Sequence, residues 1–193
     1  MITTSAAHTA EPRGKREPCA SSSSEGTDAS HDSWCRVWPP GGDDAVVYAA
    51  RSGDGTEEQL WAVDFGGVTT AVAAAELTDV SRFVHIFTLG AGGPLPAYVG
   101  GPWWEAYFGA KTKADAALAT SRLNWTSARP GLLTDENPTG LIQVGDRLYY
   151  APVTRADVAN TIIAVLTVPS TYRRAFDVVG GPCPIDEALA DFR

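Results

Sequence analysis

The sequence is short of cysteine, and its cysteines are not spaced as a redox or metal site requires. Cys19, Cys35 and Cys183 are an odd number without a C-x-x-C pair, so neither a disulfide framework nor a cysteine zinc site is predicted. The three histidines are scattered along the chain, and no metal ligand set is expected. This cysteine usage favours a reducing compartment, and we predict a cytoplasmic protein.

Positive charge and long apolar runs are also scarce. The formal net charge is −8 and the pI is about 4.8, so no basic stripe is available to bind nucleic acid or an anionic membrane. No uninterrupted apolar run approaches the ~18 residues of a membrane span, and the N-terminus lacks the apolar core of a signal peptide. With 44% hydrophobic and 20% charged residues, the composition is that of an ordinary soluble globular protein.

The first part of the chain has no pattern of a folded domain. Residues 1–42 are rich in small polar residues, include a run of four serines, and end in two prolines and two glycines. We predict a disordered or unrelated leader over 1–42. It is either a flexible tail or a stretch translated from a wrong start or frame, and the sequence leaves both readings open.

From residue 43 onward, strand-like and helix-like segments alternate. The apolar patterns predict strands at 45–50, 82–89, 124–129 and 175–179, and helices at 57–77, around 107–118, after Thr154 and at 184–189. This alternation predicts an α/β fold, a partial doubly wound, mostly parallel sheet with helices on both faces. His85 falls within the second strand, so we expect it to be a hydrogen-bonded core residue.

The most informative stretch surrounds Tyr107 and Lys111. Residues four apart on a helix lie on the same face, one turn from each other. A free phenol has a pKa near ~10 and is a poor acid or base at neutral pH. A neighbouring ammonium should lower that pKa, so we expect Tyr107 and Lys111 to form a proton relay.

The ordered motifs resemble one protein family. Thr-Leu-Gly-Ala ends the second strand, Tyr-x-x-x-Lys lies on the next helix, and Leu-Asn-Trp-Thr-x-x-Arg-Pro-Gly-x-Leu-Thr follows at 123–134. Together with the segments at 154–159 and 176–181, they resemble the atypical, NmrA-like branch of the short-chain dehydrogenase/reductase superfamily. The likeness covers residues 43–193 and implies the C-terminal portion of a Rossmann-like domain that binds NAD or NADP and acts on a small molecule.

The resemblance also implies roles for individual residues. Tyr107 would donate or accept the proton at the substrate oxygen, and Lys111 would hold the nicotinamide ribose. Thr88 takes the place of the family's usual serine, beside an atypical Phe87. Further cofactor contacts are expected from residues at the ends of the first three strands, namely Ala49, Ala50, Arg51, Leu89, Pro130, Gly131 and Leu132.

One family hallmark is missing from the sequence. No strand is followed by G-x-G-x-x-G or G-x-x-G-x-x-G, the turn whose amides and helix N-terminus receive the pyrophosphate. Gly41 and Gly42, and Gly53 and Gly55, are not expected to replace it, since neither pair lies between a strand and an adjoining helix start with the needed spacing. Three hypotheses therefore remain: an NAD(P)-dependent oxidoreductase or sugar-nucleotide-type epimerase, a non-catalytic NAD(P) sensor, and a truncated product that is marginally stable and binds nucleotide weakly or not at all. The oligomeric state is left open.

Overall fold

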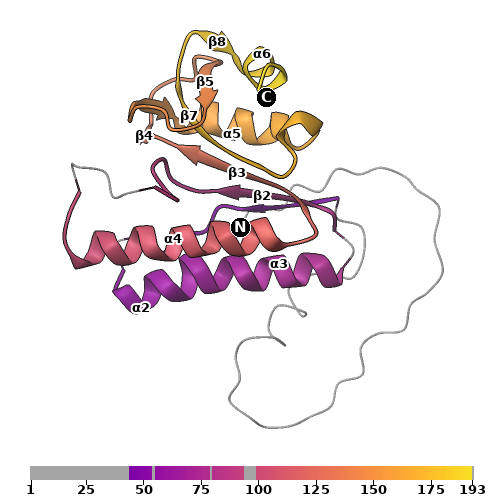
Figure 1. Ribbon diagram of the computed structural model, residues 1–193. Coiled ribbons are helices and arrows are strands. Elements are labelled where there is room, and N and C mark those ends of the chain that lie inside the picture. Colours follow the sequence, from indigo (N-terminus) through magenta and orange to yellow (C-terminus); the bar gives the residue numbers. More distant parts are fainter. Residues whose placement is uncertain (1–43, 54, 79, 94–98, 193) are drawn as a thin grey trace, which may run out of the picture.

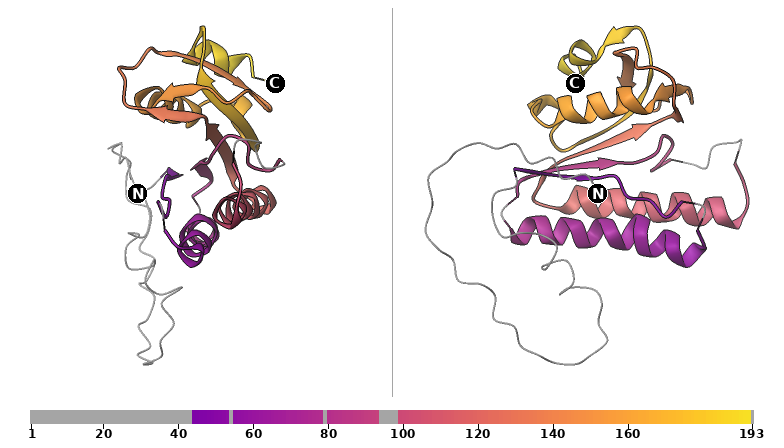
Figure 2. Two further views of the ribbon diagram at one scale, coloured as in Figure 1. Left: turned by 90° about the vertical axis from the view of Figure 1, so that its left-hand side faces the viewer. Right: turned by 180° about the vertical axis from the view of Figure 1, so that it is seen from behind.

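The computed structural model describes residues 44–53, 55–78, 80–93 and 99–192. The predicted leader over 1–42 lies outside these residues. Within them the chain forms three layers, with a central sheet between two groups of helices (Figure 1). The helices between residues 57 and 120 cover one face of the sheet, and those between residues 155 and 190 lie on the other (Figure 2).

The sheet has six strands in the order β1-β2-β3-β7-β5-β8. Its strands are Ala45–Tyr48 (β1), Arg82–Ile86 (β2), Asn124–Pro130 (β3), Arg174–Gly180 (β7), Leu141–Gly145 (β5) and Cys183–Pro184 (β8). The first four pair in parallel, and β5 runs antiparallel to both β7 and β8. The predicted α/β class and mostly parallel sheet are therefore confirmed.

A long helix follows β1, as the apolar stripe predicted. It is continuous from Glu57 to Leu77 but changes its hydrogen-bonding pattern along its length, as α2 (Glu57–Gln59), a π-helical segment η1 (Leu60–Gly67) and α3 (Val68–Leu77). By length and composition this 21-residue stretch, with a hydropathy of 1.2, could cross a membrane. In the fold its buried side packs against α4 and the sheet, as core helices do.

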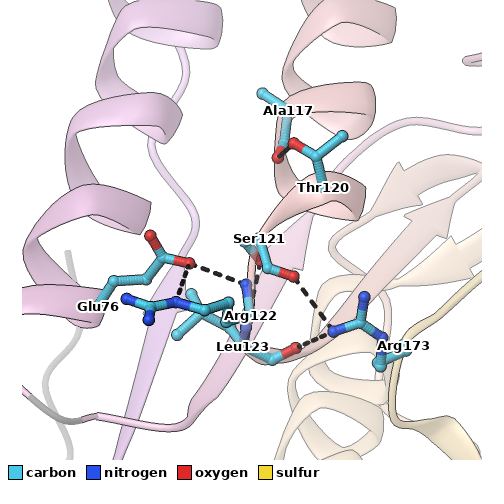
Figure 3. A network of polar contacts seen from close by, with 7 residues as sticks. All are labelled: Glu76, Ala117, Thr120, Ser121, Arg122, Leu123 and Arg173. Carbon is cyan, nitrogen blue, oxygen red and sulfur yellow. Dashed lines mark hydrogen bonds and ion pairs between the residues drawn. The ribbon is translucent and has the colours of Figure 1, made fainter.

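The helix that carries Tyr107 and Lys111 is α4, Pro102–Thr120. Pro102 occupies the first turn, where its missing N–H costs nothing, and Gly101 before it has a φ of 97° that suits glycine. Glu76 at the end of α3 accepts a hydrogen bond of 2.8 Å from the Arg122 amide (Figure 3). Arg173 donates to the carbonyl oxygens of Ser121 and Leu123, so the C-terminal end of α4 is tied to the neighbouring elements.

The other face of the sheet is built around α5, Arg155–Val165. The Thr154 hydroxyl accepts from the Asp157 amide, so the helix start predicted there is confirmed. The chain then passes through η2 (Pro169–Thr171) and ends in α6 (Ile185–Ala190). A separate two-stranded sheet, β4 (Leu132–Thr134) with β6 (Pro152–Thr154), was not predicted.

Candidate active site

The residues predicted for the site follow the parallel strands at one edge of the sheet. Ala49, Ala50 and Arg51 come after β1, Thr88 and Leu89 after β2, and Gly131 and Leu132 after Pro130 at the end of β3. In open α/β sheets, ligands bind beyond the carboxyl ends of the strands. The topology therefore places the predicted residues where the fold class binds its ligands.

Tyr107 and Thr88 meet at this edge. The Thr88 hydroxyl, after β2, lies close enough to the Tyr107 phenol of α4 to lower its pKa. Trp103, one turn earlier, stacks on the Tyr107 ring with the ring centroids 5.3 Å apart. Its indole is itself held by a 3.0 Å hydrogen bond to the Gly55 carbonyl oxygen. Tyr107 thus has Thr88 and Trp103 as neighbours, and Trp103 is anchored to the segment before α2.

A cleft of about 570 Å³ opens beside Tyr107. It is lined by Arg51, Gly100, Gly101, Pro102, Trp103, Trp104 and Tyr107. Trp104 is 37% exposed and contributes an apolar ring to the opening. This mixture of aromatic faces and a few polar groups is typical of a small-molecule site.

Lys111 lies below Tyr107 and is almost completely buried. Its Nζ is 5.7 Å from the centroid of the Tyr107 ring and forms an ion pair of 2.8 Å with Oδ1 of Asp64. Asp64 comes from η1 and is fully buried. The ammonium is therefore paired with a carboxylate on the neighbouring helix.

The pKa of Tyr107 differs from the sequence expectation. Burial raises it above its ordinary value of 10.0, and the nearby Asp64 charge raises it further. The hydrogen bond with Thr88 and the charge of Arg51 lower it without reversing the shift. The prediction of a lowered Tyr107 pKa was wrong, because burial outweighs the groups that lower it, and Lys111 is not one of those groups.

The pKa values of Lys111 and His85 are lowered, which favours the neutral form of each side chain. Burial lowers the pKa of Lys111 from 10.5, while the charge of Asp64 and its hydrogen bond oppose that shift. Burial, with the charges of Lys111 and Arg129, lowers the pKa of His85 well below 6.5. His85 is a core residue as predicted, but neither ring nitrogen has a hydrogen-bond partner among the described residues.

Gly131 has a structural explanation that needs no ligand. A Cβ at this position would lie 2.2 Å from the Ala151 carbonyl oxygen, so only glycine fits between β3 and the segment leading into β6. Leu89 is buried and donates its amide to the Pro130 carbonyl oxygen, and Leu132 donates to Ala151. These residues shape the edge of the sheet, and their contact with a cofactor remains a prediction.

The glycines after β1 lie in the segment before a helix. Gly53 and Gly55 stand between β1 and the start of α2, without the spacing of a dinucleotide-binding turn. The Thr56 side chain caps this helix, and Glu57 and Glu58 occupy its first turn. Two carboxylates at a helix N-terminus repel phosphate, so the segment still does not fit a pyrophosphate.

Two residues of the site were missed in the sequence, Asp64 and Ser52. The signal for Asp64 was present, because an aspartate three residues after Trp61 and four before Val68 lies on the apolar stripe of its helix. A carboxylate on a buried face needs a charged or hydrogen-bonding partner. Ser52 has no such signal, since it lies in a turn rich in serine, aspartate and glycine.

The fold and this edge define a Rossmann-like, nucleotide-binding class of protein. Residues 40–169 match the NAD(P)H-binding family. An uncharacterised sugar epimerase, YhfK, of Bacillus subtilis (strain 168) is 37% identical over 152 residues, which are 77% of this chain and 68% of the relative. The chain belongs to this family, in the atypical, NmrA-like branch of the short-chain dehydrogenases/reductases.

Two solved structures support the same placement. A Bacillus halodurans protein assigned provisionally as an NAD-dependent epimerase/dehydratase is 31% identical with a TM-score of 0.70, covering 76% of this chain and 69% of that one. The oxidoreductase ylbE of Lactococcus lactis is 31% identical with a TM-score of 0.68, covering 77% and 67%. The chain thus spans about two thirds of the length of these relatives.

Proposed function

We propose that this chain carries the substrate side of an NAD(P)-dependent oxidoreductase, with Tyr107 as its acid. The observation that supports this most is the position of Tyr107, which lines the cleft and has Thr88 and Lys111 as neighbours. Membership of an NAD(P)H-binding family makes a pyridine nucleotide the expected cofactor. Both NAD and NADP are compatible with the residues present.

Tyr107 is proposed to donate a proton in the reductive direction. Its raised pKa keeps the phenol protonated at neutral pH but also weakens it as an acid, so the proton moves only as negative charge develops on the substrate oxygen. The bound nucleotide would supply the hydride to a carbonyl carbon of the substrate. As the C=O π bond breaks, its electron pair moves to oxygen, and the Tyr107 hydroxyl donates its proton there. The Thr88 hydroxyl is close enough to Tyr107 to hydrogen-bond the same oxygen.

The remaining predicted residues are proposed as cofactor contacts. Lys111 would hold ribose hydroxyls, and the backbone at Ala49, Ala50 and Arg51, at Leu89, and at Pro130, Gly131 and Leu132 would line the nucleotide. The assignment is supported by the hydroxyl and ammonium donors of Thr88, Tyr107 and Lys111, which are neighbours. The first turn of α2 does not fit the pyrophosphate, so we propose that this chain binds nucleotide weakly.

The cleft suggests a substrate with a ring. Trp103, Trp104 and Tyr107 present aromatic surface to it, and such faces stack well on flat rings or on the apolar face of a sugar. The sugar-epimerase name of one relative is compatible with the second possibility. A sugar epimerase is therefore a variant of this function that the name of this relative supports, as the name of ylbE supports an oxidoreductase.

The test combines nucleotide binding with turnover. NADPH and NADH fluorescence titrations measure affinity, and single-turnover oxidation of NADPH with carbonyl compounds measures hydride transfer. Tyr107→Phe should abolish transfer and leave nucleotide affinity and the fold unchanged. Tyr149→Phe is the matched control, because Tyr149 is 95% exposed and lies away from the cleft. Equal turnover of the Tyr107→Phe variant and the wild type would refute the proposal.

A non-catalytic NAD(P) sensor is the second candidate. The acidic first turn of α2 favours it, since a weakly held nucleotide suits a protein that reports its concentration. This role predicts nucleotide-dependent binding of a partner without consumption of NADPH. Hydride transfer that depends on Tyr107 would exclude it.

A further inference from the structure

Asp64 contacts both Lys111 on α4 and Ser52 in the segment after β1, and both elements carry predicted cofactor contacts. Its Oδ1 pairs with Lys111 Nζ at 2.8 Å, and its Oδ2 accepts from the Ser52 hydroxyl at 2.7 Å and from the Ser52 amide at 3.1 Å. Ser52 immediately follows Arg51 in the segment after β1. One buried carboxylate thus contacts both the α4 lysine and the chain on the opposite side of the site.

The segment that carries Asp64 is π-helical and is tied to β1. In η1 the backbone bonds run from i to i+5, so part of the normal helical bonding is lost. The Val63 carbonyl oxygen instead accepts a 2.8 Å hydrogen bond from the Tyr48 hydroxyl of β1. A Cβ at Gly67 would lie 2.1 Å from that hydroxyl, so glycine is required for Tyr48 to reach the helix. π-helical turns are frequent at functional sites.

We propose that Asp64 is a positioning residue, held by the π-helical segment, that locks the Lys111 ammonium and the Ser52 turn into one rigid unit. The proposal rests on the proposed function only in assigning Lys111 to the cofactor ribose. The lock itself follows from three contacts to a side chain that is fully buried. Without it, the ammonium would be free to turn within its pocket or to lose its proton.

Several charged groups act on Lys111 and have to be separated from Asp64. Arg51, after β1, lowers the pKa of Lys111, and Asp115 on α4 itself raises it. His85 faces the lysine from β2 but is neutral, because burial and the charge of Lys111 lower its pKa well below 6.5. Tyr107 is protonated at neutral pH. Asp64 is therefore the carboxylate in direct contact, and Asp115 is a more distant contributor.

The experiment observes Lys111 directly by NMR. The sequence contains three lysines, Lys15, Lys111 and Lys113, so [ζ-15N]lysine labelling gives few signals. A Lys113→Arg variant, which keeps the cation over the Trp61 ring, identifies one of them. The pH titration of the Lys111 nitrogen is then compared between wild type and Asp64→Asn. Asparagine has the same shape and can still accept from Ser52, but it lacks the charge.

The proposal expects Asp64→Asn to increase the acid dissociation constant of Lys111 at least tenfold. Glu76→Gln is the matched control: Glu76 is a carboxylate on the same long helix, paired with exposed Arg122, and should leave the titration unchanged (Figure 3). An unchanged Lys111 titration in Asp64→Asn would overturn the proposal. Because the measurement needs no turnover, a chain without activity refutes the proposed function and leaves this result intact.

Ser52→Ala provides a second variant if Asp64→Asn does not fold. Without the Ser52 hydroxyl, the Asp64 carboxylate accepts one hydrogen bond fewer, so its interaction with Lys111 should strengthen. The acid dissociation constant of Lys111 should then fall, by less than tenfold. An increase, or no change, would contradict the three-part lock.

Discussion

The two faces of the sheet each bury an aspartate, and the two carboxylates have different kinds of partner. Asp157, at the start of α5, accepts from the Thr139 amide and hydroxyl, the Gly140 amide and the Thr154 hydroxyl. Asp64 pairs with the ammonium of Lys111 and with Ser52. Asp157 thus accepts hydrogen bonds from neutral groups, whereas Asp64 also contacts a titratable cation.

The buried polar side chains on the two faces of the sheet also differ in their hydrogen bonding. On the α5 side, the buried hydroxyls of Thr161 and Thr171 are hydrogen-bonded to backbone carbonyl oxygens. On the α4 side, Tyr48, His85 and Ser127 lie in register on three adjacent strands, and neither His85 nor Ser127 has a hydrogen-bond partner for its side chain among the described residues. Buried polar groups without partners are costly, and their concentration under Lys111 is a further indication of function on that face.

The largest expected effect comes from breaking the ion pair. Lys111→Met should lower the free energy of unfolding by about 4 kcal/mol, because it leaves the Asp64 charge buried without a counterion. Asp64→Asn combined with Lys111→Met should restore most of that stability, since both charges are then gone. Urea unfolding followed by circular dichroism gives the double-mutant cycle. Additive losses would mean that the two residues are not energetically coupled.

Asp157→Ala should come next, at about 3 kcal/mol, because it leaves four donors without an acceptor. Burial tends to raise the pKa of Asp157, but its hydrogen bonds with Thr139, Gly140 and Thr154 lower it below 3.8. A lowered carboxyl pKa stabilises the fold above the unfolded-state pKa, and that contribution is lost as the pH falls through the folded-state pKa. The difference from wild type, measured by urea unfolding, should therefore shrink below about pH 4. The Lys111 titration should not change.

Gly67→Ala tests the π-helical segment itself. A methyl group there would lie 2.1 Å from the Tyr48 hydroxyl, so the tyrosine has to move away from the Val63 carbonyl oxygen. We expect a loss of about 1.5 kcal/mol from this overpacking, despite the better helix propensity of alanine. Gly66→Ala is the control, because its nearest neighbour would be 3.5 Å away. Thermal unfolding of the two variants measures the contrast, and equal midpoints would argue against the contact.

The smallest effect is expected at the exposed end of the same helix. Glu76→Gln should change the free energy of unfolding by less than about 0.5 kcal/mol, because its partner Arg122 is 86% exposed and water screens the pair. Salt should reduce even this difference. Urea unfolding in low and high salt is the measurement. A loss as large as that of Lys111→Met would mean that burial does not explain the contrast.

The sequence predicted the fold well where periodicity is long and regular. The stripe over Glu57–Leu77, the helix around Tyr107 and the main parallel strands all follow from local pattern. The short strands β4 and β6 were missed, since three-residue strands have little pattern and Pro152 argues against a ladder position. Their pairing depends on segments distant in the sequence.

Within the site, positions were easier to predict than electrostatics. Tyr107 and Lys111 share a helix, so their proximity follows from spacing alone. The direction of the Tyr107 pKa shift depends on burial and on Asp64, which reaches the site from another helix. Spacing along α4 carries no information about either. The direction of the Tyr107 pKa shift predicted from these two residues was therefore wrong.

The π-helical segment also sets how this protein tolerates insertions and deletions. Bonding from i to i+5 accommodates more residues per turn than an α-helix, so the helix on either side of η1 runs in a different rotational phase. Deletion of one residue within Leu60–Val63 would let the segment revert to α-helix and rotate α2 relative to α3. Thr56 and the Gly55 carbonyl that holds Trp103 would move with it. A deletion in η1 would thus displace Trp103, one of the aromatic residues that line the cleft.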